Sequence, residues 1–83
     1  MEKILVADDE REIADLLEAC LSAGGYEVIK CYSAADVRKA PLSEVSLAIL
    51  DIMLPDGDGF SLCRELRERY LFPIIMLTAR DSD

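Results

Sequence analysis

The sequence predicts a single α/β domain in which an open parallel sheet carries helices on both faces. Short, continuous apolar runs alternate along the chain with segments whose apolar residues recur at helical spacing. Continuous apolar runs are typical of strands that are buried on both faces of a parallel sheet. With 83 residues, the chain is long enough for one small domain and too short for two. We therefore expect residues 1–83 to lie within a single domain.

The first strand is predicted over residues 3–7 and stops at a run of three acids. From residue 10 to residue 23 the period becomes helical, because five apolar residues share one helix face. These residues are Ile13, Leu16, Leu17, Cys20 and Leu21. Gly24 and Gly25 are expected to end this helix, since glycine readily adopts the left-handed conformation.

The second strand is predicted over residues 26–32, where β-forming residues are mixed with Glu27 and Lys30. This mixture suits a partly exposed strand at the edge of a sheet. Residues 33–36 resemble a capping box that opens a short second helix. That helix must end before Pro41, because the residue that precedes a proline is disfavoured in the helical conformation.

The third and fourth strands are predicted over residues 47–50 and 73–77, which are again almost entirely apolar. Asp51 ends the third strand, and a loop rich in proline, glycine and aspartate follows it. A third helix then presents an apolar stripe formed by Phe60, Cys63, Leu66 and Tyr70. The order is β-α-β-α-β-α-β, which implies right-handed crossovers between parallel strands.

Composition excludes several classes of function. The net charge is −8, and nine Lys and Arg are scattered among seventeen Asp and Glu, so this segment lacks the basic face that nucleic acid requires. Cys20, Cys31 and Cys63 have neither metal-ligand nor redox spacing, and Cys20 and Cys63 fall on predicted buried helix stripes. Reduced, structural thiols indicate a cytoplasmic protein. We find no signal peptide and no apolar run that could span a bilayer.

Polar residues follow three of the predicted strands at the edge where parallel sheets bind ligands. Asp8 and Asp9 follow the first strand, Asp51 the third and Thr78 the fourth. One acid at a strand end is often only a turn residue, whereas acids after two buried strands and a hydroxyl after another favour a site. If the first and third strands are neighbours, three carboxylates converge, and a hard divalent cation such as Mg²⁺ relieves their repulsion.

A carboxylate beside Mg²⁺ can act as a nucleophile on phosphorus, and a hydroxyl can bind an oxygen of the transferring group. This chemistry gives Asp51 the role of phosphoacceptor and Thr78 that of phosphoryl contact. Asp8 and Asp9 would then hold the metal. Spacing alone does not decide which acid is the acceptor.

Three segments, in the correct order, resemble the receiver domain of two-component response regulators. They are ILVADDE at residues 4–10, DIMLPDGDGF at residues 51–60 and PIIMLTAR at residues 73–80. The second resembles most closely the subfamily that carries a winged-helix DNA-binding domain. The resemblance covers essentially the whole chain and implies a flavodoxin-like receiver fold.

The resemblance also implies roles for individual residues. Asp51 would accept a phosphoryl group from a sensor histidine kinase. Asp9 and Asp51 would ligate Mg²⁺ directly, Asp8 often through water, and the backbone carbonyl of Met53 would complete the protein ligands. Thr78 would turn toward the phosphoryl oxygen, with the small Ala79 leaving room for the group.

Receivers of this family have five β-α units, whereas residues 1–83 match only as far as the fourth strand. The fourth helix, the fifth strand with its lysine and the fifth helix have no counterpart in this sequence. The fourth strand would then be an exposed apolar edge, which predicts self-association or swapping of elements through residues 74–77. DNA would be bound by an effector domain that lies outside this segment.

Two other functions compete with the phosphoacceptor. A receiver fragment that no longer accepts phosphate could act only by binding a kinase or a partner, and the missing lysine favours it. The acids and Thr78, all retained, favour phosphorylation. An aspartyl phosphatase resembling haloacid dehalogenases needs an acid two residues after the nucleophile, where Met53 stands. We therefore expect a signalling domain and no enzyme, although self-catalysed loss of the phosphoryl group is compatible with it.

A calcium-binding EF-hand loop is a further alternative for the loop after the third strand. Asp56, Asp58, Gly59 and Glu65 fall at positions 3, 5, 6 and 12 of such a loop. Position 1 would be Leu54, which has no side-chain oxygen, and a strand precedes the loop where a helix is required. The glycines are expected instead to shape the turn that aims Asp51.

Overall fold

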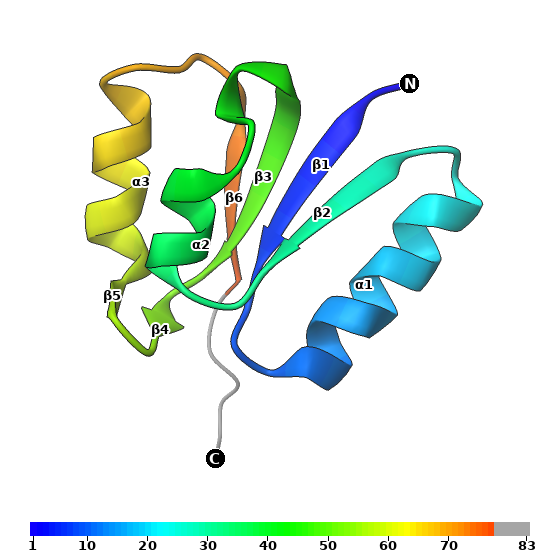
Figure 1. Ribbon diagram of the computed structural model, residues 1–83, viewed down its shortest axis with the longest axis horizontal. Helices are drawn as coiled ribbons and strands as arrows, with labels where there is room; N and C mark the ends of the chain where they lie inside the picture. The colour runs from blue at the N-terminus through cyan, green and yellow to red at the C-terminus, as the bar shows by residue number, and fades with distance from the viewer. Residues whose placement is uncertain (78–83) are drawn as a thin grey trace.

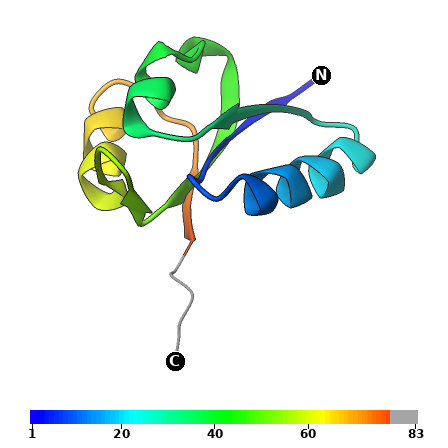
Figure 2. The same cartoon turned by 60° about the horizontal axis from the view of Figure 1, so that its bottom comes forward.

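A computed structural model describes residues 1–77 and confirms the predicted fold class. A parallel sheet of four strands, in the order β2-β1-β3-β6, has α1 on one face and α2 and α3 on the other (Figures 1 and 2). The elements are β1 (Lys3–Ala7), α1 (Arg11–Ala23), β2 (Glu27–Cys31), α2 (Ala34–Lys39), the 3₁₀ helix η1 (Leu42–Glu44), β3 (Val45–Asp51), β4 (Met53–Leu54), β5 (Gly57–Asp58), α3 (Gly59–Arg67) and β6 (Ile74–Leu77). This strand order places β1 beside β3, which is the point where ligands bind in open sheets of this kind.

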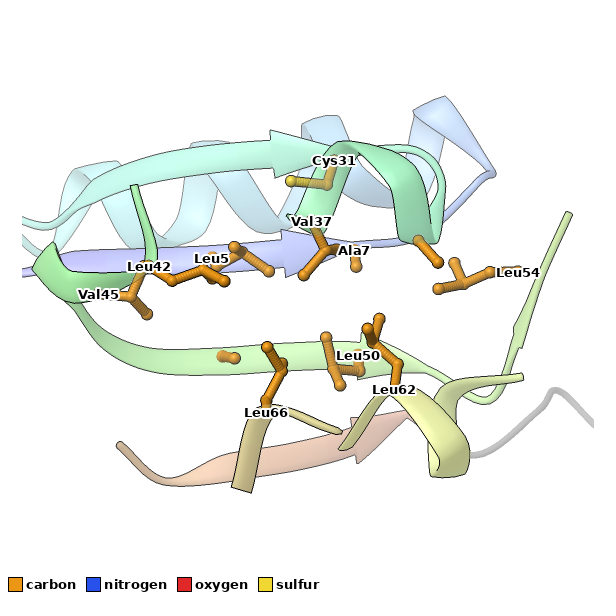
Figure 3. Close-up of a cluster of buried hydrophobic side chains, with 12 residues drawn as sticks. Leu5, Ala7, Cys31, Val37, Leu42, Val45, Leu50, Leu54, Leu62 and Leu66 are labelled. Atoms are coloured by element: carbon orange, nitrogen blue, oxygen red, sulfur yellow. The ribbon is translucent and has the colours of Figure 1, made fainter. Parts of the chain in front are cut away.

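The core lies on both faces of the sheet because successive side chains of a strand point to opposite faces. In β1, Ile4 and Val6 pack with α1, whereas Leu5 and Ala7 pack with α2 and α3. Figure 3 shows the larger cluster, in which Leu50 of β3 lies close to Leu62 of α3. Both central strands are therefore buried on two sides, as their continuous apolar sequences predict.

The predicted helix signals are confirmed. Gly25 follows α1 with a φ of 94°, the left-handed conformation that glycine tolerates best. Ser33 caps α2, its hydroxyl accepting a hydrogen bond from the backbone N–H of Asp36 at 3.1 Å. The Asp36 carboxylate in turn accepts from the N–H of Tyr32 at 3.0 Å, one residue earlier than an ideal capping box requires.

The predicted apolar stripes of α1 and α3 are partly wrong. Leu16 is 63% exposed and Cys20 is also exposed, so the prediction of a buried Cys20 is wrong. Within residues 1–77, Leu17 and Leu21 of α1 pack against the core on this face of the sheet, whereas Leu16 and Cys20 are not among the residues that do. Phe60 is 52% exposed as well, because Leu62 and Leu66 are the residues of α3 that point into the core.

Two short elements are absent from the sequence prediction. The predicted loop after Asp51 contains a small antiparallel pair, in which Met53 pairs with Asp58 and Leu54 with Gly57. The 3₁₀ helix η1 leads into β3, which is itself longer than the four apolar residues that predict it. Residues 1–77 contain no helix that is long and apolar enough to cross a membrane.

Candidate functional site

Three carboxylates converge at the carboxyl ends of β1 and β3. The two strands pair in parallel, with Ala7 opposite Leu50, so the residues that follow them arrive at the same edge of the sheet. Asp8, Asp9 and Asp51 each present one carboxylate oxygen, and these three oxygens lie within 4.8 Å of one another. The predicted convergence of the three acids is therefore confirmed.

The cluster concentrates negative charge in a partly dry environment. Asp8 is 2% exposed and Asp51 is 6% exposed, whereas Asp9 is open to solvent. Burial raises the pKa of Asp8 above its ordinary value, and the nearby Asp51 carboxylate adds to that effect. The backbone N–H of Glu10, which donates to Asp8 Oδ1 at 2.9 Å, opposes it. Within residues 1–77, none of the three carboxylates forms an ion pair with a lysine or arginine.

This donor set fits Mg²⁺. The ion is bound through one or two carboxylates and keeps several waters. Two buried carboxylates and one exposed carboxylate provide hard oxygen ligands on one side and access for water on the other. A bound cation would also remove the repulsion that the buried acids otherwise experience.

The segment after Asp51 returns at once to the end of β3. The N–H of Met53 donates to Asp51 Oδ1 at 3.4 Å, and the N–H of Gly59 donates to the carbonyl of Ile52 at 2.6 Å. A Cβ on Gly59 would overlap the carbonyl oxygen of Asp51 and lie 2.9 Å from Met76 Cε. Only glycine therefore lets α3 begin against the end of β3. Gly57, by contrast, has no atom within 4 Å of such a Cβ.

The acids of the rejected calcium loop have partners within the protein. Asp58 caps α3 by accepting from the N–H and the hydroxyl of Ser61, at 2.8 and 3.0 Å. Glu65 forms a two-bond pair with Arg38 of α2, at 2.9 and 3.1 Å. Asp56 contacts the start of α2 rather than a common centre with the others. The geometry thus agrees with the rejection of an EF-hand.

Some predicted site residues are not tested by this geometry. Thr78 and Ala79 lie outside the described residues, and the role of the Met53 carbonyl as a ligand stays a prediction. The contact of Asp56 with α2 was missed by sequence reasoning. It joins residues 22 positions apart, and no local pattern signals such a contact.

Comparison with known proteins identifies the family. The model of the response regulator receiver domain matches residues 4–83, almost the whole chain. The protein therefore belongs to the response regulator receiver family, the signalling module of two-component systems.

Individual relatives agree with this assignment. The chain is 47% identical over 83 residues to regulatory protein VanR of Enterococcus faecium, and it spans 36% of the length of that protein. It is 36% identical to the BeF₃-activated receiver domain of Klebsiella pneumoniae RstA, with a TM-score of 0.88 over 99% of this chain and 71% of that one. Thermotoga maritima TrrA, solved in complex with Mg²⁺ and BeF, is also 36% identical, with a TM-score of 0.87 over 96% of this chain and 71% of that one.

Proposed function

We propose that the protein is a phosphoacceptor in which Asp51 receives a phosphoryl group from a sensor histidine kinase in the presence of Mg²⁺. The observation that carries this proposal is the convergence of three carboxylate oxygens within 4.8 Å at the ends of β1 and β3. Membership of the receiver family and the Mg²⁺–BeF complex of the TrrA relative support it.

Asp51 is the acceptor in this proposal because it opens the segment DIMLPDGDGF, which resembles the phosphorylation loop of receiver domains. One of its carboxylate oxygens forms a bond to phosphorus while the bond from phosphorus to the kinase histidine nitrogen breaks. The nitrogen keeps the electron pair of the broken bond and takes up a proton from solvent. Thr78 binds a phosphoryl oxygen and Ala79 leaves space for the group.

Asp8, Asp9 and Asp51 hold Mg²⁺ in this proposal, together with the backbone carbonyl of Met53. When bound, Mg²⁺ neutralises negative charge on the carboxylates and on the oxygens of the transferring group. The near-complete burial of Asp8 and Asp51 strengthens this electrostatic effect, because little water screens it.

The biological setting follows from the same proposal. Phosphorylation would control a DNA-binding output domain of the winged-helix type, and this segment itself would not contact DNA. The kinase and the output domain would act in the cytoplasm, where the three free cysteines remain reduced.

Acetyl phosphate provides a direct test of phosphoryl acceptance. Intact-mass spectrometry of the chain after incubation with acetyl phosphate is expected to detect one phosphoryl adduct with Mg²⁺ and none without it. Asp51→Asn, which removes the nucleophile and keeps the shape, should show no adduct. Folded wild-type protein that gains no adduct would refute the proposal.

We also propose that residues 1–83 self-associate through β6. Among the described strands, β6 pairs only with β3, which leaves its other edge without a partner strand. Ile75 lies opposite Ile49 on the α1 face and is 49% exposed. Apolar, uncharged edges of this kind favour pairing with another chain.

Ile75→Lys should therefore reduce self-association, because an edge charge opposes strand pairing. Light scattering at tens of micromolar is expected to give at least a dimer mass for the wild type and a monomer mass for this variant. Leu71→Lys, an equal change at an exposed residue outside the strand, should leave the dimer intact. A wild-type monomer mass would contradict this proposal.

A further inference from the structure

Asp56 connects the segment after Asp51 to a second element of the fold. Asp56 lies in the turn between β4 and β5 and contacts the start of α2. Figure 1 shows the β4–β5 pair beside the start of α2. Its Oδ1 accepts from the N–H of Ala34 at 2.7 Å, and its Oδ2 accepts from the N–H of Ala35 at 3.0 Å. One carboxylate thus binds two backbone donors at the end of a helix of only six residues.

These two bonds complete the N-terminus of α2. Ser33 already supplies acceptors for the N–H groups of Asp36 and Val37, from its hydroxyl and its carbonyl. The N–H groups of Ala34 and Ala35 are therefore the donors that Asp56 satisfies. These hydrogen bonds hold the pKa of Asp56 below its ordinary value, as expected for a carboxylate that accepts backbone N–H bonds.

The contact closes a ring of bonds around the acidic cluster. On one side, the N–H of Asp8 donates to the carbonyl of Cys31 at 3.0 Å, which ties the end of β1 to the strand that leads into α2. On the other side, Met53 binds Asp51 and Gly59 binds Ile52 at the base of the β4–β5 pair. Asp56 links these two sides through the start of α2.

We propose that Asp56 is a positioning residue for the metal site, and this inference rests on the function proposed above. By tying the β4–β5 turn to α2, its carboxylate fixes the segment that begins at Met53 relative to Asp8 and Asp9. A residue in this role does not touch the metal. Its loss should lower the Mg²⁺ affinity, because the protein ligands must converge in a narrow geometry to bind the ion.

Asp58 offers a matched control in the same turn. It also carries one negative charge, and it also makes two hydrogen bonds at a helix N-terminus. Both bonds go to Ser61, three residues away, so they do not connect the turn to another element of the fold. Alanine at either position removes the same charge and a helix cap, but only Asp56→Ala cuts the link to α2.

The test measures Mg²⁺ affinity by calorimetry and backbone amide exchange by NMR for folded wild type, Asp56→Ala, Asp56→Asn and Asp58→Ala. Asp56→Ala is expected to raise the Mg²⁺ Kd by on the order of tenfold, because the segment that begins at Met53 would no longer be fixed relative to Asp8 and Asp9. It should also speed exchange of the Met53 N–H in metal-free protein. Asp56→Asn keeps one acceptor and should recover part of the affinity, whereas Asp58→Ala should change the Kd less than about twofold.

Equal changes in the Mg²⁺ Kd for Asp56→Ala and Asp58→Ala would overturn the inference, since charge or capping alone would then explain the effect. An unchanged Kd in Asp56→Ala would overturn it as well. Both outcomes leave the proposed function intact, because wild-type protein still binds Mg²⁺. A wild type without Mg²⁺ affinity would refute the function and this inference together, even if Met53 exchange responds to Asp56→Ala.

Discussion

Gly59→Ala is expected to destabilise the protein by about 3 kcal/mol or more, a large part of the total stability of a small domain. The new Cβ would overlap the carbonyl oxygen of Asp51, which is backbone at the end of a buried strand and cannot rotate away. Relief requires α3 to move away from β3, which disturbs the packing of Leu62 and Leu66 against the sheet. Urea denaturation followed by circular dichroism measures the loss.

Gly57→Ala is the control for this prediction. Gly57 lies in the same segment, but no atom lies within 4 Å of its added Cβ, so its stability should change by less than about 1 kcal/mol. Similar losses of stability for the two substitutions would indicate that the flexibility of the segment causes the loss, rather than the contact of Gly59 with Asp51. An unaffected Gly59→Ala variant would show that α3 does not begin against β3.

Asp8→Asn is expected to have opposite effects on stability and on metal binding. Without Mg²⁺ at pH 7, the variant should be more stable than wild type by on the order of 1 kcal/mol, because it removes a buried charge that lies beside Asp51. The asparagine keeps an Oδ1 that can accept from the N–H of Glu10. The Mg²⁺ Kd should nevertheless rise at least about tenfold.

The stability advantage of Asp8→Asn should depend on pH with a definite sign. The pKa of Asp8 is raised in the folded protein, so protonated Asp8 favours folding below its unfolded-state pKa of about 4. That contribution is lost as the pH rises through the folded-state pKa. Asparagine does not titrate, so the advantage of the metal-free variant should be small in acid and grow toward neutral pH.

Denaturation of metal-free wild type and Asp8→Asn between pH 4 and 7 checks this prediction. Glu68→Gln, which removes one charge at the far end of α3, serves as the control and should show no comparable growth. A variant that is less stable than wild type at every pH would mean that the Asp8 carboxylate is favourably solvated or paired, contrary to the structure.

The central acids could be predicted because their positions depend on simple topology. Asp8 and Asp51 follow continuous apolar runs, and parallel strands bring their carboxyl ends to one edge of a sheet. The prediction had to assume only that β1 and β3 are adjacent strands, and the sheet order confirms this assumption. The glycine stop after α1 and the Ser33 cap of α2 could also be predicted. Each depends only on residues that lie a few positions apart in the sequence.

The remaining features depend on contacts between distant segments. Phe60 was wrongly placed on the buried stripe of α3, because the close approach of that helix to β3 depends on the absent side chain of Gly59. Cys20 is exposed, although it lies on the apolar stripe of α1. The helical period of α1 does not specify which of its apolar residues another element covers. The contact of Asp56 with α2 could not be predicted from the sequence, because it depends on how two distant elements pack in the folded protein.

Mapping the phosphorylated residue tests whether Asp51 is the phosphoacceptor. Chain incubated with acetyl phosphate and Mg²⁺ would be reduced with borohydride, which converts an aspartyl phosphate to homoserine, and then mapped by tandem mass spectrometry. If Asp51 is the phosphoacceptor, homoserine is expected at residue 51, with aspartate retained at residues 8, 9 and 56. Homoserine at residue 8 or 9, with residue 51 unchanged, would contradict it, because the acceptor would then be one of the acids assigned to the metal.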